Sequence, residues 1–112
     1  MADLDQATWN MTIRKRNLVA AIGTARRRAT LRRKGIQFER EVIFAASSDG
    51  LSVRSSDAAM DIPGSGTWRS PIAANGATLR RLVTALEGPE IQLSYCDDQL
   101  ALNTTRISAR EV

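Results

Sequence analysis

The sequence predicts one α+β domain built from two copies of a strand, helix and hairpin unit. Three observations lead to this prediction: the chain has 112 residues, its apolar residues follow strand and helix periods in turn, and its two halves show these patterns in one order. A chain of this length holds one compact core and is too short for two ordinary domains. We therefore expect residues 1–112 to form a single domain, with internal repeats over about residues 8–62 and 68–111.

The first repeat is predicted to contain a strand, a helix and then three further strands. Trp9, Met11 and Ile13 alternate with polar residues across residues 7–13, which is the period of a half-buried strand. From about Lys15 the apolar residues recur at helical spacing, so a helix should run toward the arginines that follow. The other strands are expected at residues 41–47, 50–56 and 58–62, with an Asp-Gly turn after the first and a break at Pro63-Gly64-Ser65-Gly66.

The second repeat is predicted to follow the same order after that break. A strand is expected at residues 68–73, and a helix at 77–87 whose Leu79, Leu82, Val83 and Leu86 stand at i, i+3, i+4 and i+7. Gly88-Pro89 should end this helix. The remaining strands are expected at residues 90–96, 99–105 and 106–110, with a turn at Asp97-Asp98.

The hairpins of the two halves match at a single offset of 49 residues. At this offset Val42 meets Ile91, Phe44 meets Leu93, Leu51 meets Leu100 and Val53 meets Leu102. One register thus serves both strands and the turn between them, which favours an internal duplication of a β-α-β-β-β unit. Each helix has one apolar stripe, so we expect both helices to pack on one face of a curved antiparallel sheet.

The composition excludes several classes of catalytic and structural site. The sequence contains no histidine and one cysteine, Cys96, so His-based triads and zinc sites, an intrachain disulfide and a Cys-x-x-Cys pair cannot form. The adjacent carboxylates Asp97 and Asp98 stand where a hairpin turn is expected. We expect a protein that is not an enzyme and holds no metal or cofactor. No apolar run reaches the length of a membrane span and no secretory signal is recognised, so a soluble, cytoplasmic protein is predicted.

The positive charge is concentrated in the first part of the chain. Residues 1–40 contain ten Lys or Arg against three Asp or Glu, whereas residues 41–112 contain six against nine. Six of the cations fall within nine residues: Arg26, Arg27, Arg28, Arg32, Arg33 and Lys34. They can grip phosphates, or they can stand on a solvated helix end that the helix dipole favours. The dipole accounts for one or two cations, because its effect fades within a turn, so we favour a polyanion.

The order of elements and several stretches of sequence resemble one domain of a DNA sliding clamp, the class of the DNA polymerase III beta subunit and PCNA-like proteins. The stretches are residues 42–61, Pro63-Gly64, Leu79-Arg80-Arg81-Leu82-Val83 and Glu90-Ile91-Gln92-Leu93. The resemblance implies a processivity factor of DNA replication, whose paired helices line a channel around the duplex. The matching channel residues would be Lys15, Arg16, Arg80 and Arg81.

Two features depart from the clamp pattern. Clamp rings are closed by six such domains, whereas this chain has one, and the arginine-rich segment stands where a clamp has a plainer connection. A ring would therefore need a homo-oligomer joined head to tail through sheet edges. The leading hypothesis is a non-enzymatic clamp-like protein that contacts the backbone of double-stranded DNA without sequence preference. The alternative is a protein-interaction module that docks on a replication protein or a true sliding clamp through its sheet edges.

Three further motifs receive structural readings. No aromatic residue is interleaved with the basic run, so base stacking is not supported. Trp9 and Trp68 precede the two predicted helices in matching places, where core packing explains them better than contact with bases. Gly64-Ser65-Gly66 is read as a turn and not as a phosphate-binding loop, because a strand and not a helix follows it.

Overall fold

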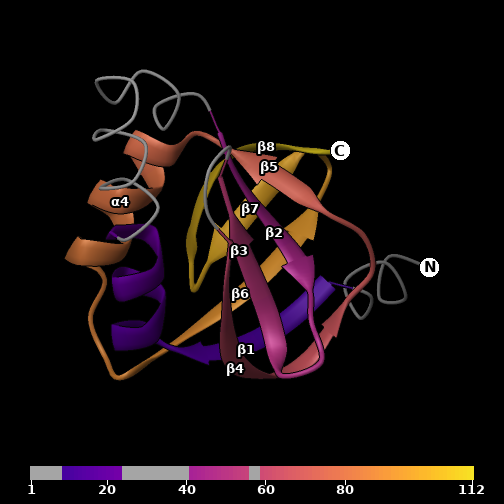
Figure 1. The fold of residues 1–112 in the computed structure, drawn as a ribbon. Helices are drawn as coiled ribbons and strands as arrows, with labels where there is room; N and C mark the ends of the chain where they lie inside the picture. Colours follow the sequence, from indigo (N-terminus) through magenta and orange to yellow (C-terminus); the bar gives the residue numbers. More distant parts are fainter. Residues whose placement is uncertain (1–8, 24–40, 56–58) are drawn as a thin grey trace.

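The computed structural model describes residues 9–23, 41–55 and 59–112, and Figure 1 shows how their elements are arranged. We call the helix over residues 15–23 the first helix. The other elements are β1 (Trp9–Arg14), β2 (Val42–Ala46), β3 (Gly50–Arg54), β4 (Ala59–Trp68), β5 (Ile72–Ala74), α4 (Gly76–Ala85), β6 (Glu90–Cys96), β7 (Gln99–Leu102) and β8 (Thr105–Glu111).

The strands form a closed barrel, whereas the sequence predicts a curved antiparallel sheet without indicating closure. They pair in the order β1-β4-β3-β2-β5-β8-β7-β6, and β6 returns to β1 with Met11 opposite Leu93 and Ile13 opposite Ile91. All of these pairs are antiparallel. The closing pair joins segments that are distant in sequence, and hydrophobic periodicity carries no signal for such a contact. The fold combines helices and strands, as predicted, but strands dominate it.

The predicted break at Pro63-Gly64-Ser65-Gly66 is wrong, because β4 runs through it as one strand of ten residues. Its first half pairs with β3, where Pro63 lies opposite Gly50, and its second half pairs with β1. A Cβ atom on Gly66 would lie 1.9 Å from the carbonyl oxygen of Asn10. Glycine is therefore required here by the close approach of the β1 backbone, and not by a turn. Pro63 has no backbone N–H to donate. It is tolerated here because the pairing of β4 with β3 ends at this residue and the pairing with β1 begins at the next.

The predicted strand at residues 68–73 is also wrong in its bounds. Trp68 ends β4, and the short β5 begins only at Ile72. Trp9 and Trp68 lie opposite each other in the pair of β1 and β4, so they do not occupy matching places in two repeats. Both side chains are buried, as core packing predicts.

The two helices lie side by side on one side of the barrel, as Figure 1 shows. The first helix contributes Leu18 and Ile22 to the core, and α4 contributes Leu79 and Val83, all with at most 1% of their surface exposed. These side chains belong to one continuous cluster with the inward residues of both halves of the barrel, including Phe44. Burial of each such side chain contributes about 1.5–3 kcal/mol. The expected common placement of the helices is therefore confirmed.

The second helix and the last hairpin agree closely with the sequence. The Asn75 side chain caps α4 by accepting a hydrogen bond from the Thr78 backbone N–H at 2.9 Å. The Asp97-Asp98 turn is confirmed, and both residues have positive φ, 53° and 62°. Neither helix of the described residues combines the length and the apolar content that crossing a membrane requires.

We predict that Gly66→Ala destabilises the fold by about 3 kcal/mol or more. Gly66 has φ of 134°, where an added side chain is strained, and the new methyl group would overlap the Asn10 carbonyl. Gly88→Ala is the matched control, because Gly88 also has positive φ, 95°, but has open space around it. Its cost should be about 1 kcal/mol. Urea unfolding monitored by tryptophan fluorescence measures both, and equal losses would contradict the close-approach explanation.

Candidate nucleic-acid interface

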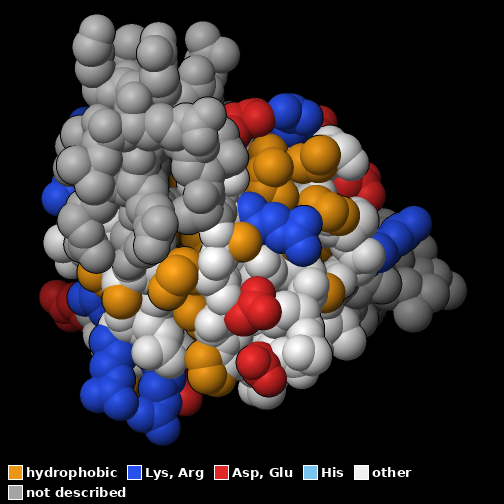
Figure 2. Space-filling model, in the orientation of Figure 1, with side chains coloured by type: hydrophobic (Ala, Val, Ile, Leu, Met, Phe, Trp, Pro, Cys, Tyr) orange, Lys and Arg blue, Asp and Glu red, His pale blue; other side chains and the backbone are white. Residues whose placement is uncertain are grey.

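The predicted binding residues divide into two groups. Arg26, Arg27, Arg28, Arg32, Arg33 and Lys34 lie outside the described residues, so their role stays a prediction. Lys15 and Arg16 begin the first helix, and Arg80 and Arg81 stand in the middle of α4. The structure thus brings four of the predicted cations onto one pair of neighbouring helices. In Figure 2, Lys and Arg side chains gather at the lower left, below the two helices of Figure 1.

Arg16, Arg80 and Arg81 are exposed on this helix pair. The apolar stripes of both helices point into the core, so the polar positions between them face outward. Arg80 also lines a depression of about 430 Å³ between the helices, together with Ala20 and Gly23 of the first helix. The positive charge of α4 therefore borders the first helix and is not isolated on its own element.

Lys15 also has a structural role, which the sequence does not predict. Its side-chain ammonium donates a hydrogen bond to the Leu86 carbonyl at the end of α4, and its backbone N–H donates to the Pro89 carbonyl at 2.9 Å. The last turn of α4 contains no basic residue of its own. A cation at this end stabilises the helix dipole and satisfies a carbonyl that has no partner within the helix. Lys15 thus joins the start of one helix to the end of the other.

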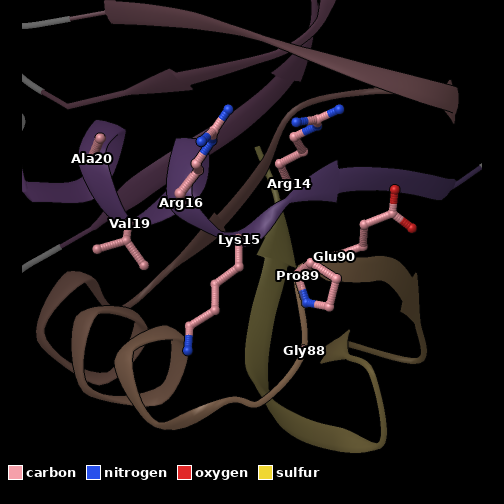
Figure 3. Close-up of a pocket in the computed structure, with 8 residues that line it drawn as sticks. All are labelled: Arg14, Lys15, Arg16, Val19, Ala20, Gly88, Pro89 and Glu90. Atoms are coloured by element: carbon pink, nitrogen blue, oxygen red, sulfur yellow. The ribbon is translucent and has the colours of Figure 1, made fainter.

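Arg14 is a neighbouring cation that sequence reasoning missed. It ends β1, is exposed, and with Arg16 lines a depression of about 690 Å³ that also includes Pro89 and Glu90. Figure 3 shows the Arg14 and Arg16 side chains extending to the same side, whereas Lys15 extends away from them. The sequence does show three consecutive cations, Arg14-Lys15-Arg16. The structure is needed to show that Arg14 and Arg16 are exposed whereas Lys15 between them is half-buried.

The surface arginines differ in how far their charge is compensated. Arg110 forms a two-pronged ion pair with Glu41, with distances of 2.9 and 2.6 Å, and this hydrogen-bonded carboxylate raises the pKa of Arg110. No described residue forms an ion pair with Arg14, Arg16 or Arg80. Within the part of the chain that the structure describes, the guanidinium groups on the helix side thus lack the carboxylate partner that Arg110 has.

The large aromatic side chains are engaged in the core. The indole N–H of Trp9 donates to the Ser70 carbonyl at 3.3 Å, and that of Trp68 donates to the Phe44 carbonyl at 3.0 Å. Trp9 also packs edge to face on Tyr95, with ring centroids 5.1 Å apart. Neither indole can serve as a stacking platform for bases without opening the core.

Asp98 of the last hairpin makes a structural contact. The Tyr95 hydroxyl donates to the Asp98 carboxylate at 3.1 Å across the turn, and burial followed by this hydrogen bond raises the pKa of Tyr95. In the described ranges, no group of three or more His, Cys, Asp or Glu residues is placed to hold a metal ion.

No protein-family model and no curated protein matches the sequence. Solved structures do match the fold. The match to the beta sliding clamp of C. crescentus has a TM-score of 0.71 and 22% identity, and it covers 93% of this chain and 30% of that chain. The match to the sliding clamp of Pseudomonas aeruginosa, DNA polymerase III subunit beta, has a TM-score of 0.65 and 14% identity, and it covers 93% of this chain and 31% of that chain. The match to the DNA polymerase sliding clamp of Bacillus subtilis has a TM-score of 0.63 and 13% identity, and it covers 94% of this chain and 31% of that chain.

These likenesses confirm the resemblance that the sequence predicts. The chain folds as a sliding-clamp-like domain over nearly its whole length, and it spans about three tenths of the length of the clamps it matches. At these identities the likeness concerns the fold alone.

We predict that Lys15→Met lowers the free energy of unfolding by about 1 kcal/mol, because the end of α4 loses both its cation and a hydrogen bond. Arg81→Met is the matched control, since Arg81 is exposed on the same helix pair, and its effect should stay within about 0.5 kcal/mol. Urea midpoints at constant slope compare the two. A loss for Lys15→Met no larger than that of the control would show that the contact does not hold the helices together.

Proposed function

We propose that this chain is a non-enzymatic, clamp-like DNA-binding protein that contacts the backbone of double-stranded DNA through its helix pair. We further propose that copies associate through the part-paired segments of β4 and β8 into a homo-oligomer, which could form a closed ring. The cytoplasmic location predicted from the sequence is compatible with both proposals.

The observation that carries the proposal is the common placement of the two helices, with Arg16, Arg80 and Arg81 exposed on them. Guanidinium groups donate planar pairs of hydrogen bonds that suit phosphate oxygens, and each phosphate neutralised releases counterions. The arginine-rich segment, residues 26–34, follows the first helix in the sequence and would add to the same positive field.

Contact with the backbone is favoured over contact with bases. Both indoles are buried and hydrogen-bonded in the core, so the helix pair offers charge without aromatic platforms. Phosphate contacts of this kind fix position on the duplex but carry no sequence information. We therefore expect binding without sequence preference.

The pairing registers support an internal duplication. Phe44 lies opposite Val53 in β2 and β3, and Leu93 lies opposite Leu102 in β6 and β7, so both pairs repeat at an offset of 49 residues. The strand order is also the same in each half, β1-β4-β3-β2 followed by β5-β8-β7-β6. The opening strands and helices repeat at an offset of 61 residues, as the buried pair Leu18 and Leu79 illustrates. We propose that the halves descend from one β-α-β-β-β unit. Leu18 and Val42 are 24 positions apart, whereas the matching Leu79 and Ile91 are 12 apart, so the first half has 12 more residues between helix and hairpin.

Open backbone positions on β4 and β8 support association between copies. In the described residues, 59–63 of β4 pair only with β3 and 64–68 pair only with β1. In the same way, 105–108 of β8 pair only with β7 and 109–111 only with β5. The sides of residues 59–63 of β4 and 105–108 of β8 that have no strand partner can serve as templates for a strand of another copy. A head-to-tail contact closes a ring only if its rotation divides a full turn.

A second function follows from the same edges if no ring forms. The chain would then be an interaction module that docks on a replication protein or on a true sliding clamp. Light scattering distinguishes the two: a stable assembly of about six copies favours the ring, whereas a monomer or dimer without DNA affinity favours the module.

We predict that duplex binding falls steeply with salt and depends on the helix arginines. The logarithm of affinity should decrease linearly with the logarithm of salt concentration. Arg16→Ala, Arg80→Ala and Arg81→Ala together should reduce that slope by about 0.9 for each phosphate that the variant no longer neutralises. Fluorescence anisotropy with a labelled duplex at several salt concentrations measures the slope.

The control for this experiment is Arg54→Ala, which removes an exposed cation from β3 without touching the helix pair. It should leave the slope unchanged. Affinity that does not respond to salt, or an equal loss of slope in the control, would contradict the proposed surface. Retention on circular DNA with release from linear DNA, measured on the same proteins, tests encirclement separately.

A further inference from the structure

We propose that the depression at the fork where β1 and β4 separate binds a free ribonucleoside diphosphate. The depression has a volume of about 500 Å³, which is in the range of pockets for small ligands. Its polar lining comprises Thr12, Arg14, Arg16, Asn17, Ser65 and Glu90. This inference goes beyond backbone contact with DNA and beyond association between copies, and it depends on neither.

The depression exists because β4 changes its partner strand. Residues 64–68 of β4 pair with β1, with Gly64 opposite Ile13, whereas residues 59–63 pair with β3. Beyond Ile13 the two strands therefore separate, and Arg14 has no partner residue on β4. The chain then enters the first helix directly, so Arg14 and Arg16 lie at the fork. The walls of the hollow thus come from two strands and the start of a helix.

Two arginines on one side of the junction supply the positive charge of the fork. Figure 3 shows Arg14 and Arg16 extending to the same side, away from Lys15 and Pro89. Both are exposed, and none of the described residues forms an ion pair with either. Neighbouring guanidinium groups donate planar pairs of hydrogen bonds to phosphoryl oxygens. Two of them suit a ligand with two linked phosphoryl groups.

The start of the first helix adds to the attraction for an anion. Arg14 stands where a helix commonly has a capping side chain, and a guanidinium group offers no acceptor to the N–H groups of the first turn. In α4 this place is taken by Asn75, whose side chain accepts from the Thr78 N–H at 2.9 Å. Three consecutive cations, residues 14–16, also lie at the positive end of the helix dipole, which is unfavourable. A bound phosphate group would offset both disadvantages.

Glu90 favours a ribonucleotide over a DNA backbone. It lies opposite Arg14 in the pair of β1 and β6 and lines the same depression, yet no ion pair between the two is formed in the described structure. A carboxylate at this place repels a continuous row of phosphates. It can accept hydrogen bonds from ribose hydroxyl groups, as acidic residues do in dinucleotide-binding sites. A ribonucleotide can thus place its diphosphate at the arginines and its ribose at Glu90.

The test titrates the full chain, labelled with nitrogen-15, with ADP. We expect saturable shifts of the backbone amide signals of Asn17, Gly64 and Ser65, and weaker binding at high salt. Pyrophosphate should compete for the same signals with about tenfold lower affinity, because it lacks the ribose. 2′-Deoxy-ADP should bind about fivefold more weakly than ADP, because it lacks one hydroxyl donor to Glu90.

Variants of the protein locate the site. Arg14 lies outside the surface proposed for the duplex, and Arg14→Ala should weaken ADP binding by about tenfold. Glu90→Ala should remove the difference between ADP and 2′-deoxy-ADP and should strengthen the binding of pyrophosphate. Arg54→Ala is the matched control, because Arg54 also ends a strand and is exposed, and it should leave the ADP affinity unchanged. Thermal unfolding of each variant establishes that it is folded.

Three outcomes would overturn the proposal. The first is the absence of saturable ADP binding, or an equal affinity for ADP and pyrophosphate, which would leave only an unspecific attraction for anions. The second is an ADP affinity that Arg14→Ala does not change, or that falls equally in Arg54→Ala. The third is a 5′-phosphorylated DNA tetranucleotide that binds more tightly than ADP and loses this affinity in Arg14→Ala, which would assign the fork to a DNA end. None of these measurements uses a duplex, so their results are independent of the proposed duplex binding.

Discussion

The close approach of β1 to the second half of β4 is the constraint on which the rest of the structure depends. Met11 lies opposite Gly66 and Ile13 opposite Gly64, and side chains at either glycine would meet atoms of β1. β1 in turn pairs with β6 and closes the barrel. Because β1 continues directly into the first helix, the position of that strand sets where the helix begins. The cation-bearing surface is therefore a consequence of backbone packing between two strands.

The contact between Lys15 and the end of α4 extends this constraint from the barrel to the helices. The residue after the last position of β1 donates both its backbone N–H and its side-chain ammonium to the segment that follows α4. The two helices thus share one fixed point in addition to their common core. The exposed Arg16 and Arg80 take their relative positions from this arrangement, so changes at buried or capping residues should alter the surface without removing any of its charges.

The sequence predicts those elements whose signals are local. The helix α4 lies within two residues of its predicted bounds, because the spacing of Leu79 and Val83 and the cap at Asn75 act within a few residues. It ends at Ala85, ahead of the predicted stop at Gly88. The Pro63–Gly66 segment has equally strong local signals for a turn, yet β4 continues through it. Its glycines are required by the close approach of β1 and not by a turn in their own segment. Barrel closure was missed for the same reason.

In the candidate site too, some features follow from local sequence signals and others depend on contacts between distant segments. Exposure of Arg16, Arg80 and Arg81 follows from the helical period alone, whereas the role of Lys15 depends on Leu86, which lies far away in sequence. Arg14 was missed because the depression that it lines with Arg16 forms only where the strand-to-helix junction meets residues 88–90, which are distant in sequence.

The two ends of the helix pair differ in a way that reconciles a continuous polyanion with a compact phosphorylated ligand. Gly23, from which the chain continues toward the arginine-rich segment, borders the same depression as Arg80. The opposite end carries Arg14 and Arg16 but also Glu90 and the carbonyl terminus of α4. These negative groups make that end less suited to a continuous polyanion and better suited to a ligand that also has hydrogen-bond donors. The two ends of the helix pair therefore differ in the charged residues that line them.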